Sequence, residues 1–227
     1  MTSSTITLAD GLTLTFDQMR EHLTAAIVCD ALDQIELRRQ SPAVALPAIT
    51  VDRILVGRCK TTLWADMSHE DPNPYELELA AVDGCVTDDV MIAAAGGSMR
   101  SGIWGELLTT AAVNRGCIGA IVHGAVRDVR RMSQMDFPIY AAGTCLYDSQ
   151  HRQRVIDVDV PVEIGGVLFS PSDLVFADRD GIVVVPKAHE AEVLARAWKK
   201  LHEENAVRDA IKKGMLATEA YETFGVL

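Results

Sequence analysis

The sequence lacks the cysteine patterns that mark disulfide-rich proteins and zinc sites. Its 227 residues contain five cysteines, an odd number, and no pair has CxxC spacing. Most of them lie in apolar surroundings, such as AAIVCDAL and NRGCIGAIV, where a free thiol behaves as a small hydrophobic side chain. We therefore predict neither a disulfide framework nor a structural zinc site.

The chain also lacks an excess of positive charge. It carries 32 acidic and 21 basic residues, a net charge of −11, and the two signs are mixed along the sequence. This argues against nucleic acid as a partner, because phosphate binding needs a basic face. No apolar run is as long as a membrane span, and the N-terminus lacks the basic start and apolar core of a signal peptide. We predict a cytoplasmic protein without a membrane partner.

Three further motifs are incomplete. The glycine-rich GGSMRSG stretch matches neither the Walker A loop nor the dinucleotide fingerprint, so a nucleotide cofactor has no support. The ADRDG segment lacks the spacing of an EF-hand loop and favours a tight hairpin. The SQHR segment has no acidic partner in a recognisable order, which argues against a hydrolase triad.

The composition itself, with 48% hydrophobic and 23% charged residues, is ordinary for a soluble globular protein. Hydrophobic spacing predicts a helix after the N-cap Thr15, strands at 54–64, 90–95 and 118–122, and a helix between Gly105 and Gly116. A turn is expected at Gly96-Gly97. Because strands occur both between helices and in succession, we expect a mixed sheet in a layered arrangement.

The later chain changes character. Residues 137–186 predict several short strands separated by turns, and the chain from Lys187 predicts one long charged helix followed by a short helix at 218–224. A long helix with few hydrophobic residues suggests packing on a neighbouring subunit. We therefore divide the chain into an α/β domain, 1–186, and a C-terminal helical extension, 187–227.

The stretch 105–128 carries the candidate chemistry. If a helix begins at Glu106, the amides of Leu107 and Leu108 lack intrahelical acceptors and offer a site for a carboxylate, while their side chains belong to the core. Arg127 presents a planar fork suited to a carboxylate, and Asp128 offers the hard oxygen that Mg²⁺ prefers. Taken singly, Glu106 also fits a helix cap and Arg127-Asp128 a surface ion pair.

A recognisable pattern is formed by Glu106 and, after twenty intervening residues, Arg127-Asp128, within the segment WGELLTTAAVNRGCIGAIVHGAVRD. Two later segments belong to the same pattern, FPIYAAGT and VEIGGVLFSPSDLVFADRDGIVVVP. It resembles the class II 4-hydroxy-4-methyl-2-oxoglutarate/4-carboxy-4-hydroxy-2-oxoadipate aldolases and the related regulator of ribonuclease activity A. The resemblance covers most of the chain from about Thr15 onward. It implies a β-β-α sandwich like that of swivelling phosphohistidine domains, assembled into trimers or hexamers with sites between subunits.

The resemblance also implies roles for individual residues. Asp128 would hold Mg²⁺ or Mn²⁺, and Glu106 would contact metal-bound water. Arg127 would bind a substrate oxygen and stabilise the enolate, and the amides of Leu107 and Leu108 would hold the pyruvyl carboxylate.

A glutamate from the C-terminal helix of a neighbouring subunit completes the family's site, and Glu204, with Glu203 beside it, matches it here. Arg131 stands where these aldolases commonly have an acidic residue, three positions after the aspartate. His123 replaces the usual small or polar residue before GAVRD, and we expect it to be a hydrogen-bonded structural residue.

The expected function is a metal-dependent lyase acting on a small 2-oxo acid, by retro-aldol cleavage and by oxaloacetate decarboxylation through one pyruvate enolate. The alternative is a non-catalytic regulator that binds a protein such as a ribonuclease. A methyltransferase ranks last, because no glycine-rich cofactor loop with a following acidic residue is present.

Overall fold

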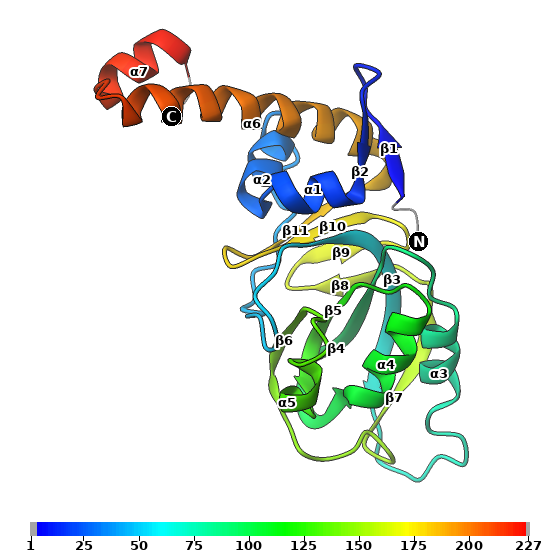
Figure 1. Cartoon of the computed structure of the whole chain (residues 1–227). Coiled ribbons are helices and arrows are strands. Elements are labelled where there is room, and N and C mark those ends of the chain that lie inside the picture. The colour runs from blue at the N-terminus through cyan, green and yellow to red at the C-terminus, as the bar shows by residue number, and fades with distance from the viewer. Residues whose placement is uncertain (1–3, 226–227) are drawn as a thin grey trace.

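A computed structural model describes residues 4–225 and shows one central mixed sheet (Figure 1). Its strands lie in the order β11-β10-β3-β4-β5-β6, and β7 pairs with β3. The pairings from β3 through β6 are parallel, and those of β7, β10 and β11 are antiparallel. The strands of this sheet are β3 (Leu55–Asp66), β4 (Asp89–Trp104), β5 (Gly119–Val126), β6 (Ile139–Thr144), β7 (Gln153–Val158), β10 (Leu174–Ala177) and β11 (Ile182–Val185).

The other elements cover the sheet or lie at one end of it. Two hairpins are formed by β1 (Thr5–Thr7) with β2 (Thr13–Thr15) and by β8 (Val162–Ile164) with β9 (Val167–Phe169). The helices are α1 (Phe16–His22), α2 (Ala25–Asp33), α3 (Glu76–Asp83), α4 (Glu106–Asn114), α5 (Val129–Met132), the 3-10 helix η1 (Lys187–His189), α6 (Glu190–Lys212) and α7 (Ala217–Phe224).

The alternation of side chains along β4 explains the layers. Met91 and Ala93 pack with α3 and α4 on one face, and Val90 and Ile92 pack with the β8–β9 hairpin on the other. Both faces of this central strand are therefore buried, which accounts for its continuous apolar sequence. The layered β-β-α sandwich predicted from the sequence is confirmed.

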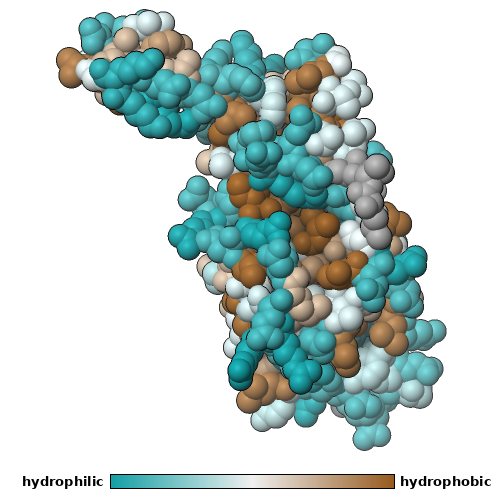
Figure 2. Space-filling view, in the orientation of Figure 1, coloured by the Kyte–Doolittle hydropathy of each residue, from teal (hydrophilic) through white to brown (hydrophobic). Residues whose placement is uncertain are grey.

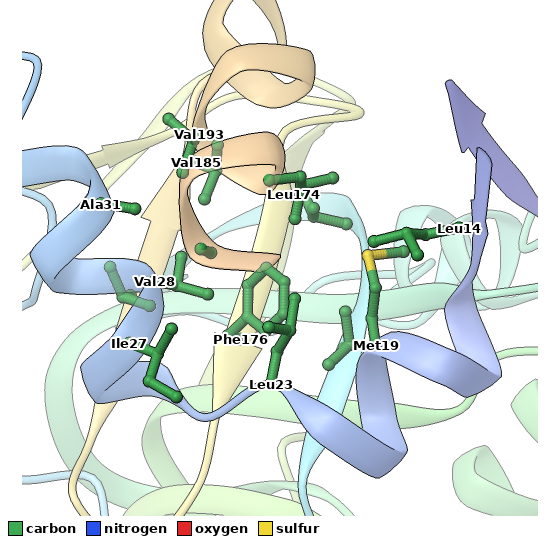
Figure 3. Close-up of a cluster of buried hydrophobic side chains, with 14 of the residues drawn as sticks. Leu14, Met19, Leu23, Ile27, Val28, Ala31, Leu174, Phe176, Val185 and Val193 are labelled. Atoms are coloured by element: carbon green, nitrogen blue, oxygen red, sulfur yellow. The ribbon is translucent and has the colours of Figure 1, made fainter. Parts of the chain in front are cut away.

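A separate hydrophobic core lies at the helical end, where α1, α2 and α6 pack on β10 and β11 (Figure 3). Phe176 lies at its centre and is fully buried. The helical pattern that begins after Thr15 forms two helices, because Thr24 accepts from the Ile27 amide and starts α2. Thr15 caps α1 as predicted, in a capping box with Gln18.

Two local predictions differ from the structure. The expected turn at Gly96-Gly97 lies within β4: both glycines have positive φ, 61° and 76°, and the pairing with β5 shifts register across them, between Ala94 and Ser98. The strand thus bends without ending, as at a β-bulge. In addition, α3 was not predicted from the sequence.

The C-terminal helices extend away from the sheet (Figure 1). The first turns of α6 bury Val193, Leu194 and Ala197 in the helical core of the same chain. The rest of α6 is mainly hydrophilic, and α7 exposes Tyr221 and Phe224 (Figure 2). The packing of this extension on a neighbouring subunit stays a prediction, and so does the division of the chain into two regions at residue 186. Residues 1–3 of the first region and 226–227 of the second lie outside the described residues.

Across residues 4–225, no helix combines the length and the apolar character needed to span a membrane.

Candidate active site

The junction between β4 and α4 forms one edge of the site. Trp104 ends β4 and is buried, and its indole Nε1 donates to Thr109 Oγ1 at 2.9 Å, which fixes the corner between strand and helix. Because α4 begins at Glu106, as predicted, the amides of Leu107 and Leu108 have no intrahelical acceptor. The helix therefore directs N–H groups and a partial positive charge outward at this edge.

The two leucine side chains differ. Leu107 is 77% exposed, so the expectation that it belongs to the core is wrong, whereas the half-buried Leu108 packs against the core beside α3 and α4. The reason is the way α4 meets the sheet: it buries Thr109 and Ala112, one turn apart, and this turns Leu107 outward.

Arg127 and Asp128 directly follow the last residue of β5, which is the strand next to β4 in the sheet. β5 extends through Gly124 and Ala125 to Val126, beyond the strand predicted at 118–122. Asp128 has a left-handed backbone, with φ 58°, and its Oδ2 accepts from the Glu106 amide at 3.3 Å. The structure therefore brings Glu106, Arg127 and Asp128 together.

Gly105 makes this approach of strand and helix possible. A Cβ atom at this position would lie 2.8 Å from Asp128 Oδ2 and 3.2 Å from Arg127 Cγ. Its φ of −151° is available to any residue, so what requires glycine here is space rather than backbone conformation.

A cleft of about 280 Å³ opens beside these residues. Besides the α4 edge, it is lined by Ser149 of the SQHR segment and by Tyr75, Glu78 and Asp148, which sequence reasoning did not single out. Arg127 Nη2 lies 2.7 Å from Asp148 Oδ2, and the Tyr75 hydroxyl donates to Asp148 Oδ1 at 2.5 Å. Three segments remote in sequence are thereby joined at one carboxylate.

These contacts set the charge state of two cleft residues. Burial alone would raise the pKa of Asp148, but hydrogen bonds from Tyr75 and the Gln150 amide, together with Arg127, hold it below its ordinary value. Burial and the hydrogen bond to Asp148 raise the pKa of Tyr75 to about 12. At neutral pH the cleft therefore contains an Arg127–Asp148 ion pair and a neutral tyrosine.

Glu78 forms part of the cleft wall and is almost fully buried. Burial, and next the charge of Asp148, raises its pKa to about 8, while Arg127 opposes the shift. The signal that could have found it is a glutamate at the position where the apolar face of a helix is expected, one turn before the buried Ala81 and Val82.

The carboxylates at the α4 edge fit a hydrated Mg²⁺ or Mn²⁺ ion better than a closed metal cage. Nowhere in the described chain do three or more His, Cys, Asp or Glu side chains form a group that could hold a metal ion. Magnesium commonly uses only one or two carboxylates and keeps several waters. Asp128 and Glu106 supply such a pair of hard oxygen donors.

The remaining predicted positions lie apart from the cleft or at its rim. Glu204 is on α6, where it pairs with Lys200 at 3.2 Å and Arg208 at 3.8 Å, and it does not line the cleft of its own chain. Arg131 lies 3.9 Å from Glu106 Oε2. His123 is half-buried, and its buried Nδ1 lacks the hydrogen bond that we expected.

The model of the RraA-like family, described as Aldolase/RraA, matches residues 25–184, most of the chain. The chain belongs to this family. It is 35% identical over 133 residues to a Halalkalibacterium halodurans protein provisionally named as a 4-hydroxy-4-methyl-2-oxoglutarate aldolase. That match covers 59% of the chain and 63% of the relative, so less than two thirds of the relative's length is spanned.

Two solved structures, one of them of an RraA family member, have the same fold. Streptomyces coelicolor RraAS2, described as an unusual member of the RNase ES inhibitor RraA family, is 30% identical with a TM-score of 0.73, covering 82% of this chain and 91% of that one. A Pseudomonas syringae pv. tomato protein is 26% identical with a TM-score of 0.78, covering 88% and 93%.

Proposed function

We propose that this RraA-like protein is a divalent-metal-dependent lyase that cleaves a C–C bond of a small 2-oxo acid through a pyruvate enolate. The observation that carries the proposal is the meeting of Arg127, Asp128 and the first turn of α4 at one cleft. The similarity to proteins named as 4-hydroxy-4-methyl-2-oxoglutarate aldolases supports the same reaction class.

The substrate carboxylate would bind at the N-terminus of α4, where the amides of Leu107 and Leu108 have no helical acceptor. Arg127 lies beside this position and would stabilise the negative charge that develops on the enolate oxygen. Asp128, with Glu106 close by, would hold Mg²⁺ or Mn²⁺, which when bound polarises the 2-oxo group and serves as an electron sink.

Retro-aldol cleavage of 4-hydroxy-4-methyl-2-oxoglutarate and decarboxylation of oxaloacetate would both use this site. In each reaction the electron pair of the broken C–C bond remains on the pyruvyl half as an enolate, so the same groups stabilise both. Arg131 places a positive charge next to Glu106. The aldolases that this sequence resembles commonly have an acidic residue at the position of Arg131. We expect this charge to favour substrates with a second carboxylate.

The complete site would lie between subunits of a homotrimer or homohexamer. Glu204 cannot contribute to the cleft of its own chain, because α6 lies at the other end of the molecule from α4 (Figure 1). The projecting helix would instead bring it to the cleft of a neighbouring copy.

The test is pyruvate release from oxaloacetate and from 4-hydroxy-4-methyl-2-oxoglutarate, with Mg²⁺, with Mn²⁺ and with EDTA. Asp128→Asn removes the charge but tolerates the left-handed backbone. Asp136→Asn is the matched control, because Asp136 is also left-handed, with φ 53°, and exposed. Metal-dependent release that Asp128→Asn alone abolishes supports the proposal, and release unaffected by EDTA refutes it.

A second candidate is a regulator that binds a ribonuclease, supported by the similarity to an RNase ES inhibitor family. A regulator would show no metal-dependent turnover. Its binding to a ribonuclease would also persist in Arg127→Ala, because the Arg127 side chain is two-thirds buried beside the cleft and offers little contact surface.

A further inference from the structure

Glu78 differs from its neighbours on α3. It is 7% exposed, whereas Glu76, two residues earlier, is exposed to solvent. Its Oε2 atom is one of three buried side-chain polar atoms within residues 4–225 that have no hydrogen-bond partner. Buried carboxyl groups are normally paired, so an unpaired one in the wall of a cleft requires an explanation.

The surroundings of Glu78 are polar on one side and apolar on the other. Toward the cleft lie Asp148, Arg127 and the Tyr75 hydroxyl. Away from the cleft, Glu78 borders a small recess whose lining is mainly apolar and includes Trp64, Val82, Met91 and Trp104. A charged carboxylate is disfavoured by this apolar wall and by the charge of Asp148, and Arg127 is already paired with Asp148 at 2.7 Å.

The other groups of the cleft are poorly suited to giving a proton at neutral pH. The guanidinium of Arg127 keeps its protons. Asp148 is held as a carboxylate by Tyr75 and Arg127, and the Tyr75 proton is committed to Asp148. Glu78 is the carboxyl of this cleft that stays protonated, because burial and Asp148 raise its pKa to about 8.

We infer that Glu78 is a catalytic acid of the cleft, which donates its proton to the carbanion carbon of the cleaved 2-oxo acid. The inference rests on the proposed function and adds a proton donor to it. Once the C–C bond is broken, the enolate forms a C–H bond with the proton of Glu78, whose O–H bond breaks to leave a carboxylate. A proton from water, or the one released by the substrate's 4-hydroxyl, restores the acid.

The same step in reverse provides the test. With Mg²⁺ and pyruvate in D₂O, the Glu78 carboxylate would remove a methyl proton, and NMR follows the incorporation of deuterium. We expect wild-type exchange to rise about tenfold per pH unit below a pH of about 8 and to level off above it. Glu78→Gln should lose at least about 100-fold in exchange rate and this pH profile, whereas the matched variant Glu76→Gln should keep both.

Two measurements separate a catalytic role from a structural one. Glu78→Asp keeps a carboxyl group and should recover part of the exchange and a pH-dependent profile, which a packing role would not restore. In metal-free protein labelled with ¹³C at the glutamate carboxyls, one resonance should titrate near pH 8 and be missing from Glu78→Gln.

The outcomes distinguish this inference from the proposed function. If the wild type exchanges pyruvate protons, Glu78→Gln does not, and neither 2-oxo acid is cleaved, the cleavage reaction is wrong and the role of Glu78 in proton transfer stands. If cleavage and exchange are both unchanged in Glu78→Gln, the role of Glu78 alone is wrong. If the wild type shows neither cleavage nor exchange, both are wrong.

Discussion

The helical end and the cleft bury their side chains for different purposes. At the helical end, the buried cluster is made of apolar side chains such as Phe176 and Val193, and Thr15 and Thr24 cap the helices that cover it. In the cleft, a carboxyl group is buried without a hydrogen bond and an aspartate adopts a left-handed backbone. The apolar cluster at the helical end stabilises the native state. The buried carboxyl and the left-handed aspartate of the cleft destabilise it, but they supply reactive groups.

The largest expected effect is on the stability of the helical end. Phe176→Ala should lower the free energy of unfolding by about 3–5 kcal/mol, because it removes a fully buried ring from the centre of the cluster. Urea unfolding measures this change, with Phe224→Ala, 40% exposed on α7, as a control expected to change by about 0.5 kcal/mol or less. Similar losses in both variants would contradict the assignment of this core.

Arg127→Ala should have the opposite character, with a large effect on activity and a small one on stability. We expect kcat/KM for pyruvate release to fall roughly 10²–10³-fold, as for loss of a group that stabilises a developing oxyanion. Arg130→Ala, exposed on α5, is the control. A change confined to KM would indicate that Arg127 binds substrate without stabilising the enolate.

The buried Glu78 should make stability depend on pH. Its native pKa of about 8 exceeds its ordinary value of 4.5, so between these values the native state holds a proton that the unfolded chain has released. Stability from this group is therefore complete below pH 4.5 and decreases as pH rises toward 8. Wild-type unfolding free energy should fall by about 2 kcal/mol more than that of Glu78→Gln between about pH 6 and about pH 8, measured in urea. Parallel pH curves would show that Glu78 is ionised in the native state.

The smallest expected effect tests the capping of α1. Thr15→Ala removes the hydroxyl that accepts from the Gln18 amide at 3.1 Å and should lower the unfolding free energy by about 1 kcal/mol. Thr15→Ser retains the hydroxyl and should lie within a few tenths of a kcal/mol of the wild type. Activity should be unchanged in both, since α1 does not line the cleft.

The sequence was sufficient to predict the frame of the site. Gly105, Gly116 and the apolar residues between and after them set the bounds of α4 and the position of β5, so Glu106 and Arg127-Asp128 could be expected near one another. Both α4 and β5 are set by residues close together in the sequence, so the spacing of their hydrophobic residues and the flanking glycines are enough to predict them.

The opposite wall of the cleft could not be predicted in this way. Asp148 meets Tyr75 and Arg127 only through the pairing of distant strands, which no local pattern encodes. Glu78 was missed because α3 is short and only weakly amphipathic, with a glutamate where its buried face begins. The position of Glu204 relative to a cleft depends on a second subunit, so neither the pattern nor one chain determines it.

The hydrogen bond between Tyr75 and Asp148 joins residues 73 positions apart, across the parallel strands β4, β5 and β6. Such long-range pairings form slowly, because the chain must close large loops before any contact compensates for the lost entropy. We therefore expect the wall of the cleft that contains Asp148 to form only after these strands have paired. A chain shortened before residue 148 would retain Glu106, Arg127 and Asp128 but could not assemble the opposite wall of the cleft.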